Sequence, residues 1–179
     1  MYKSNNKQLV YKLLTTEDLR SFYASVSCIK SGLDSRYTKL TEVGDVNRSG
    51  SIVLAATPQL KAQGVKKIAR LYEIPKRPDI LIVNSIMQTY IKCSNYLTSL
   101  ALQYVAPKDF HQYSIDVFFM DITAFLHLVA NTPYEFTLKF NREIYNRTRI
   151  ESTIGISPNL LMNKAAKNIE ATQNHSLDL

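Results

Sequence analysis

Two aspartates are the candidate catalytic residues of this chain, because each adjoins a short apolar or aromatic run. Asp116 falls within residues 114–123, which have the pattern of two short strands joined by a turn. Asp18 lies three residues before an aromatic helix start at residue 21. Carboxylates at the ends of separate strands can converge on a pair of divalent cations. Because an aspartate at a strand end is also a common turn or cap residue, the residues alone leave both interpretations open.

The elements that must position these aspartates can be predicted from apolar periodicity and from proline and glycine positions. Strands are expected at residues 9–14, 52–56, 80–83 and 149–156, with a hairpin at 113–123. Helices are expected at residues 21–29, 58–63, 86–105 and 133–145, and a last one opens at Ser157-Pro158. This order predicts an α+β fold: a ferredoxin-like sheet with packed helices, interrupted by a small basic α/β insertion.

The net charge of +7 is concentrated in the first half of the chain. Residues 1–80 carry 14 Lys and Arg against 7 Asp and Glu, whereas residues 81–179 carry 8 of each sign. The basic segment, residues 61–77, contributes six cations: Lys61, Lys66, Lys67, Arg70, Lys76 and Arg77. This asymmetry favours a polyanionic partner such as nucleic acid, although a solvated surface without a ligand has the same composition.

Other classes of protein are not favoured by the sequence. No apolar run approaches the ~18 residues of a membrane span, and the first residues lack the apolar stretch of a signal peptide, so a cytoplasmic protein is expected. Cys28 and Cys93 have no zinc-ligand spacing and are expected to be buried, reduced thiols. The three histidines share no spacing with Asp or Cys that would indicate a metal site.

Several ordered motifs resemble the Y-family (UmuC/UvrX-like, ImpB/MucB/SamB-type) translesion DNA polymerases. Residues 18–26 match the first palm motif, and residues 114–123 match the second except at Val117. Residues 44–58 and 70–75 look like the fingers of the UvrX-type branch, and residues 155–166 resemble the helix that closes the palm. The resemblance covers residues 9–168, nearly the whole chain.

The resemblance implies roles for individual residues. Asp18 and Asp116 would bind two Mg²⁺ ions, with Mn²⁺ as an alternative, for template-directed nucleotidyl transfer. Tyr23 would be the steric gate that excludes a 2′-hydroxyl. Phe22, Lys61 and Lys164 would contact the nucleotide. DNA contacts would come from the basic segment, through Lys66, Lys67 and Arg70.

The same resemblance predicts the domains and partners. The palm would comprise residues 1–32 and 79–171 and the fingers residues 33–78, followed by a frayed tail at 172–179; thumb and little finger are expected to be absent. Partners would be primer–template DNA and deoxynucleotides, with a sliding clamp or a chain supplying the missing domains as further candidates. The cellular role would be DNA repair and SOS-type damage tolerance.

Four departures from the family pattern leave alternatives to a full polymerase. Val117 stands where the family has a catalytic glutamate, Ser27 replaces a usual acid, residues 15–17 are polar for a buried strand, and the chain ends early. Whether the chain is an enzyme is therefore left open. A non-catalytic module that binds nucleotide, DNA or a polymerase is one alternative, and a decayed reading frame without function is another.

Overall fold

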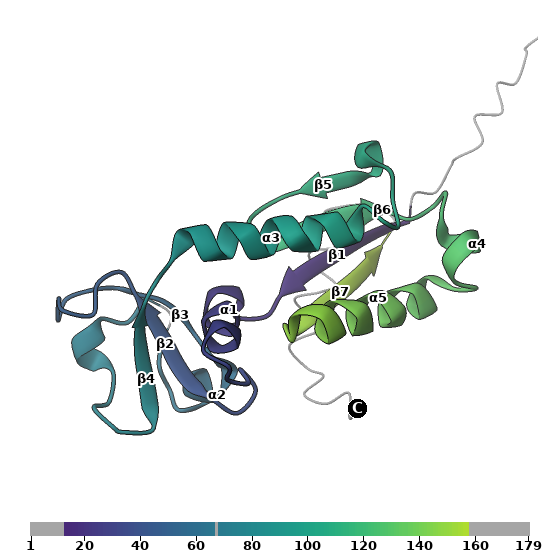
Figure 1. Cartoon of the computed structure of the whole chain (residues 1–179). Coiled ribbons are helices and arrows are strands. Elements are labelled where there is room, and N and C mark those ends of the chain that lie inside the picture. The colour runs from purple at the N-terminus through teal and green to yellow at the C-terminus, as the bar shows by residue number, and fades with distance from the viewer. Residues whose placement is uncertain (1–12, 67, 158–179) are drawn as a thin grey trace, which may run out of the picture.

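The computed structural model describes residues 13–66 and 68–157, which form two β-sheets connected by helices (Figure 1). The four-stranded sheet has the order β5-β6-β1-β7, and the three-stranded sheet has the order β3-β2-β4. Each sheet has its own buried apolar cluster. The candidate site residues come from both sheets and from the helix between them.

The four-stranded sheet is antiparallel throughout, with β1 (Leu14–Leu19) in its interior. On one side β1 pairs with β6 (Val117–Asp121), which pairs in turn with β5 (Phe110–Gln112). On the other side β1 pairs with β7 (Ser152–Ser157). The first strand thus lies between the third and the fourth, which is the ferredoxin-like order, and the predicted fold class is confirmed.

Two long helices, α3 (Met87–Ala101) and α5 (Pro133–Thr148), pack on one face of this sheet (Figure 1). Leu97 and Leu100 of α3 and Phe136 and Phe140 of α5 are buried in the same cluster as Phe118 of β6. The short helices η2 (Pro107–Asp109) and α4 (Leu126–Val129) lie in the connections. The opposite face of the sheet is therefore the face on which polar site residues can be presented.

The amino end of α5 has a side-chain cap that the sequence encodes locally. The Thr132 hydroxyl accepts a hydrogen bond from the backbone N–H of Glu135, at 3.1 Å, and Pro133 occupies the first helical position. The Glu135 carboxylate accepts in return from the backbone N–H of Asn131, at 3.0 Å. These bonds satisfy donors that a helix start leaves unpaired, so the helix begins where the predicted one begins.

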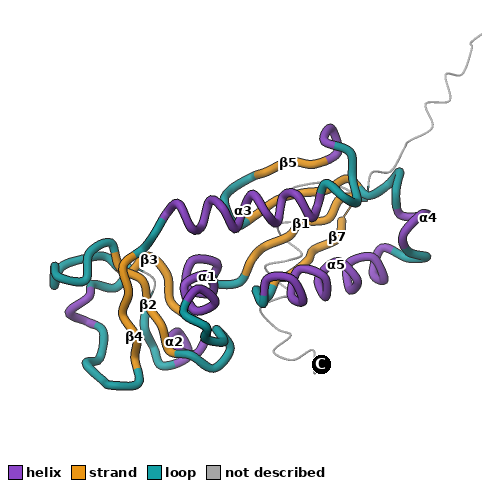
Figure 2. The backbone as a smooth tube through the Cα atoms, viewed as in Figure 1, coloured by secondary structure: helices purple, strands orange, loops and turns teal. Residues whose placement is uncertain are grey.

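The three-stranded sheet is mixed, because β2 (Lys39–Val43) pairs antiparallel with β3 (Val53–Ala56) and parallel with β4 (Ile80–Asn84). The connection from β3 to β4 contains the short helices α2 (Pro58–Ala62) and η1 (Leu71–Glu73) (Figure 2). The sequence predicted a domain boundary near Pro78. In the structure β4 pairs with β2 and therefore belongs to this sheet. The paired residues are about 40 positions apart in the chain, so local sequence patterns do not reveal the pairing.

Helix α1 (Phe22–Lys30) connects the two sheets. Phe22 and Val26 are buried in the cluster under α3 and α5, whereas Ala24 and Cys28 pack against Leu40 of β2. The predicted burial of Cys28 is confirmed, and Cys93 is only partly buried; both thiols are free. Because α1 contributes to the buried clusters of both sheets, its residues can hold the two sheets in a fixed position relative to each other.

The prediction that the first strand ends at Leu14 was wrong, since β1 begins at that residue. The predicted residues 9–12 lie outside the described part of the chain. The strand runs through the polar residues Thr15, Thr16 and Glu17, which are all buried. Pairing with strands on both sides, rather than apolar side chains, determines its position. In the predicted hairpin, β5 likewise precedes Tyr113, so the turn spans residues 113–116.

Candidate active site

The two candidate aspartates lie at the same end of the four-stranded sheet, on neighbouring strands. Asp18 is near the end of β1, and Asp116 directly precedes β6. The backbone N–H of Leu19 donates to the carbonyl of Asp116 at 3.0 Å, which holds the two segments together. The Ser114 hydroxyl donates to Asp116 Oδ1 at 2.7 Å and orients that carboxylate. The register thus brings together the backbone segments of two aspartates that are almost 100 residues apart in sequence.

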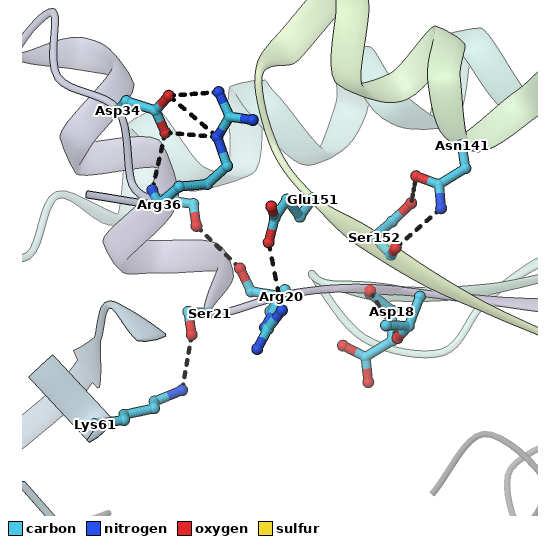
Figure 3. A network of polar contacts seen from close by, with 11 residues as sticks. Asp18, Arg20, Ser21, Asp34, Arg36, Lys61, Asn141, Glu151 and Ser152 are labelled. Atoms are coloured by element: carbon cyan, nitrogen blue, oxygen red, sulfur yellow. Dashed lines mark hydrogen bonds and ion pairs between the residues drawn. The ribbon is translucent and has the colours of Figure 1, made fainter. Parts of the chain in front are cut away.

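The side chain beside Asp18 on β6 is Val117, its direct partner in the antiparallel register. On the other side Asp18 is opposite Thr153 of β7. Residues paired in this way present their side chains on the same face of the sheet. Figure 3 shows the Asp18 carboxylate pointing away from the Asn141–Ser152 hydrogen bonds, which lie on the helix-covered side. A carboxylate at position 117 would therefore lie next to Asp18, and valine supplies none.

The donor set fits a cation that a nucleotide brings with it better than one held by protein alone. Among residues 13–66 and 68–157, no group of three or more acidic, histidine or cysteine side chains gathers at one place. Mg²⁺ is commonly bound through one or two carboxylates, with substrate phosphates and water completing its coordination. Asp18 and Asp116 would supply that number of carboxylates for one ion, and the second predicted ion would depend on the same two residues.

Tyr23 lies in the first turn of α1, near Asp116, and is partly exposed. Its ring packs against the ring of Tyr90, with centroids 4.7 Å apart. Burial raises the pKa of Tyr23, and the negative charges of Asp116 and Glu42 raise it further. The hydroxyl therefore stays protonated at neutral pH, and the ring is available as a flat surface beside Asp116.

Phe22 does not support the predicted nucleotide contact through its ring. The side chain is 3% exposed and belongs to the buried cluster beneath α3 and α5. Neighbouring residues of an α-helix point about 100° apart. The Phe22 side chain therefore points into the core, whereas the Tyr23 side chain is turned outward. The aromatic pair thus separates into a core residue and a site residue.

Lys61 reaches across from the three-stranded sheet to the start of α1. Its Nζ donates to the hydroxyl of Ser21 at 2.8 Å (Figure 3). Ser21 has φ of 48°, a left-handed backbone conformation that is unusual for a residue other than glycine. The contact places the Lys61 ammonium group beside Ser21, which is three residues after Asp18 and two residues before Tyr23 in sequence.

The rest of the basic segment is mostly distributed over the surface. Lys66 and Arg70 are exposed, and the Arg70 guanidinium donates to the carbonyl of Gly50 at 2.9 Å. Arg77 forms an ion pair with Asp79 at 2.6 Å, so part of the predicted positive charge is neutralised. The predicted contacts at Lys67 and Lys164 lie outside the described residues.

The structure also reveals residues near the site that the sequence did not single out. Arg20 pairs with Glu151 at 3.5 Å, across the end of β7 (Figure 3). Glu42 is fully buried on β2 and accepts a hydrogen bond from Ser27 of α1. Glu42 lies between the β-branched residues Thr41 and Val43, which is a signal that the sequence does contain, whereas the Arg20 pairing follows only from the register.

This arrangement resembles the palm and fingers region of Y-family polymerases. A solved chimera of the Y-family DNA polymerases Dbh and Dpo4 superposes with a TM-score of 0.75 at 19% identity, covering 87% of this chain and 45% of that chain. The chain itself belongs to the impB/mucB/samB family, whose model matches residues 17–168. The family assignment predicted from the motifs is thereby confirmed.

Two curated relatives from Bacillus subtilis strain 168 carry repair-related names. The chain is 36% identical to the putative UV-damage repair protein UvrX over 170 residues, which is 94% of this chain and 39% of UvrX. It is 47% identical to the DNA repair protein homolog YozK over 100 residues, which is 55% of this chain and 87% of YozK. The chain thus spans about two fifths of the length of UvrX.

Within residues 13–66 and 68–157, no helix combines the length and the apolar character needed to cross a bilayer.

Proposed function

We propose that this chain performs the palm and fingers functions of a translesion DNA polymerase, adding deoxynucleotides to a primer 3′ end under the direction of a template. The observation that supports this proposal most directly is the backbone hydrogen bond between Leu19, which follows Asp18, and Asp116. Asp116 in turn lies near Tyr23, and Lys61 is hydrogen-bonded to Ser21 at the start of the same helix. The reaction class would be nucleotidyl transfer in a cytoplasmic response to DNA damage.

Each side chain has a role that its position supports. Asp18 and Asp116 would hold Mg²⁺, or Mn²⁺ in its place, together with the oxygens of the incoming triphosphate. The bound ion would supply charge neutralisation for the triphosphate and the leaving group. Tyr23 would stack beneath the sugar and exclude a 2′-hydroxyl. Lys61, which already reaches the start of α1, would contact the triphosphate as a point charge.

The basic segment would contact DNA. Lys66 and Arg70 are exposed on the three-stranded sheet's connection, where phosphates could be neutralised. Such contacts carry no sequence information, which suits a polymerase that must accept any template. Primer–template DNA and deoxynucleotides are therefore the proposed partners.

A second candidate function is a non-catalytic module that binds nucleotide or DNA. The observation that favours it is Val117 opposite Asp18, which removes one carboxylate from the position next to the metal ligands. Fewer carboxylates should weaken the cation that activates the primer hydroxyl, while leaving the Lys61 and Tyr23 contacts available for binding.

Primer extension distinguishes these two functions. The folded chain is incubated with primer–template and deoxynucleotides in Mg²⁺ or Mn²⁺, beside Asp116→Ala. Extension that disappears in Asp116→Ala supports the polymerase. Nucleotide binding without extension supports the binding module, and Val117→Glu should then raise the affinity for Mg²⁺-nucleotide. A folded protein that neither extends a primer nor binds nucleotide or DNA would refute both proposals.

A further inference from the structure

A carboxylate outside the proposed metal ligands occupies the junction between the two sheets. Glu42 lies on β2 with 0% exposure, and its strand neighbours on the same face are Ala55 and Val83. This face of the sheet packs against α1, through Leu40 and Cys28. Burial raises the pKa of Glu42, and hydrogen bonds from Ser27 and Tyr90 act in the opposite direction. A carboxyl group in such surroundings costs free energy unless its hydrogen bonds compensate.

The hydrogen bonds of Glu42 connect three elements. The Ser27 hydroxyl, on α1, donates to Glu42 Oε1. The hydroxyls of Ser27 and Tyr90 are 3.3 Å apart, and the backbone N–H of Ile86 donates to Tyr90 Oη at 3.0 Å. Because Tyr90 Oη accepts from Ile86, its own hydrogen is free to point toward Ser27 and Glu42. The network thereby fixes Tyr90 from both sides.

Tyr90 is the residue against which the proposed steric gate packs. The rings of Tyr23 and Tyr90 are 4.7 Å apart and inclined by 36°. Ser27 follows Tyr23 by one helical turn, so the network also contacts the helix face that carries the gate. The position of the Tyr23 ring consequently depends on a hydrogen-bonded group behind it, which is anchored on the other sheet.

We propose that Glu42 is a positioning residue: by holding Ser27 and Tyr90, it fixes the ring of Tyr23 and so sets how strongly the site discriminates against a 2′-hydroxyl. This proposal rests on the proposed role of Tyr23 as the steric gate. Glu42 belongs to the three-stranded sheet, and the hydrogen bond that it accepts comes from Ser27 rather than from a residue adjoining Asp18 or Asp116. It acts only through the two side chains that it binds.

A purely structural role for Glu42 would have a different signature. Glu42 Oε2 has no hydrogen-bond partner among the described residues, so the burial of this oxygen lowers the stability of the fold. Removing a buried carboxyl group that has an unpaired oxygen also removes the cost of its desolvation. A leucine at this position should therefore preserve or raise the free energy of unfolding. It should also release Tyr90, so that the Tyr23 ring is held less firmly in place.

The experiment uses the whole chain with four test and control variants, and with Tyr23→Phe and Tyr23→Ala as two reference variants. Glu42→Leu removes the network, Glu42→Gln retains an acceptor oxygen for Ser27, and Tyr90→Phe removes the hydroxyl but keeps the ring. Glu17→Leu is the matched control, because Glu17 is an equally buried carboxyl on β1 with no bond to Tyr90 or Ser27. Thermal unfolding of each variant tests whether it is folded.

Two measurements follow on these proteins. The first is NMR with ¹³C-labelled tyrosine, which detects the contact between the Tyr23 and Tyr90 rings; Tyr23→Phe assigns the resonance. The second is the ratio of the dissociation constants for ATP and dATP in Mg²⁺. We expect Glu42→Leu and Tyr90→Phe to lose the ring contact and to lower the ratio toward that of Tyr23→Ala. Glu42→Gln should remain close to the parent.

The outcomes separate this proposal from the proposed function. If the parent chain binds neither nucleotide, the polymerase proposal fails, but the NMR measurement still decides whether Glu42 positions Tyr23. If Glu42→Leu keeps the ring contact as fully as Glu17→Leu does, the positioning role is overturned. If the ring contact is lost while the ATP to dATP ratio is unchanged, the link to sugar discrimination is overturned.

Discussion

Glu17 is the least favourably placed side chain of the four-stranded sheet, and it makes a quantitative prediction possible. It has 0% exposure, and neither carboxyl oxygen has a hydrogen-bond partner among the described residues. Its neighbours across the strands are Phe118 and Ile154, which belong to or pack against the buried cluster under α3 and α5. Burial raises the pKa of Glu17 well above its ordinary value.

The direction of the pH dependence follows from this pKa. In the unfolded chain Glu17 titrates near about 4.3, and in the folded chain it holds its proton to a higher pH. The folded state therefore binds more protons between these two values, and its free energy of unfolding falls as the pH rises through that window. Below about pH 4.3 the titration of Glu17 costs no stability, and above its folded pKa the cost of that titration is complete.

Glu17→Leu should stabilise the protein by an amount that grows with pH. At a pH where Glu17 is neutral, the gain is the cost of an unpaired buried polar group, about 1–3 kcal/mol. For a chain of this length that corresponds to a rise in melting temperature of roughly 2–12 °C. At higher pH the gain increases, because the folded parent must either keep Glu17 protonated or bury its negative charge. Leucine does not titrate and has no such cost.

Unfolding by urea, followed by circular dichroism at several pH values from 5 to 8, measures this difference. Glu17→Gln keeps a polar group but cannot titrate, so it should flatten the pH dependence with a smaller gain in stability. Glu73→Gln, at an exposed carboxylate, should change the free energy of unfolding by less than about 0.5 kcal/mol. A Glu17→Leu protein that is less stable than the parent, or equally altered at pH 5 and pH 8, would refute the reasoning.

Three further predictions concern a helix cap, a cation and a thiol. Thr132→Ala removes the hydroxyl that accepts from the Glu135 N–H and should lower the free energy of unfolding by about 1 kcal/mol, measured by urea titration; an unchanged value would show that the cap is dispensable. Lys61→Ala should weaken binding of Mg²⁺-dATP by about tenfold, whereas Lys66→Ala should change it little; equal effects in a fluorescence titration would contradict a specific role for Lys61. Cys28 should resist a thiol reagent at pH 8 until the protein unfolds, because burial and neighbouring carboxylates raise the pKa of its thiol to about 11; rapid modification of the folded protein would contradict its position.

Much of the fold could be predicted from local patterns. The helices α1, α3 and α5 begin within one residue of their predicted starts, because apolar spacing, Pro133 and the Thr132 cap are encoded in adjacent residues. The motifs at residues 18–26 and 114–123 were enough to predict the family, and with it the two aspartates and Tyr23. These features depend on neighbours in sequence, which a reader of the sequence can see.

Strand pairing could not be predicted in the same way. The position of β1 differs from the predicted one by five residues, and β4 belongs to the other sheet from the one expected. Both outcomes result from hydrogen bonds between segments far apart in the chain, and the residues themselves carry little information about the partner. The polar run Thr15–Glu17 shows this most clearly, since pairing on both sides buries residues that propensity alone would leave at a strand end.

The sequence by itself determined which residue types are available for chemistry: Asp18, Asp116 and Tyr23, with valine at position 117. Only the tertiary structure decided that Val117 lies directly opposite Asp18, that Lys61 reaches Ser21, and that Glu42 and Tyr90 lie behind the Tyr23 ring. The physical reason is that side-chain chemistry is local to each residue, whereas proximity is created by strand register and by the packing of α1 between two sheets.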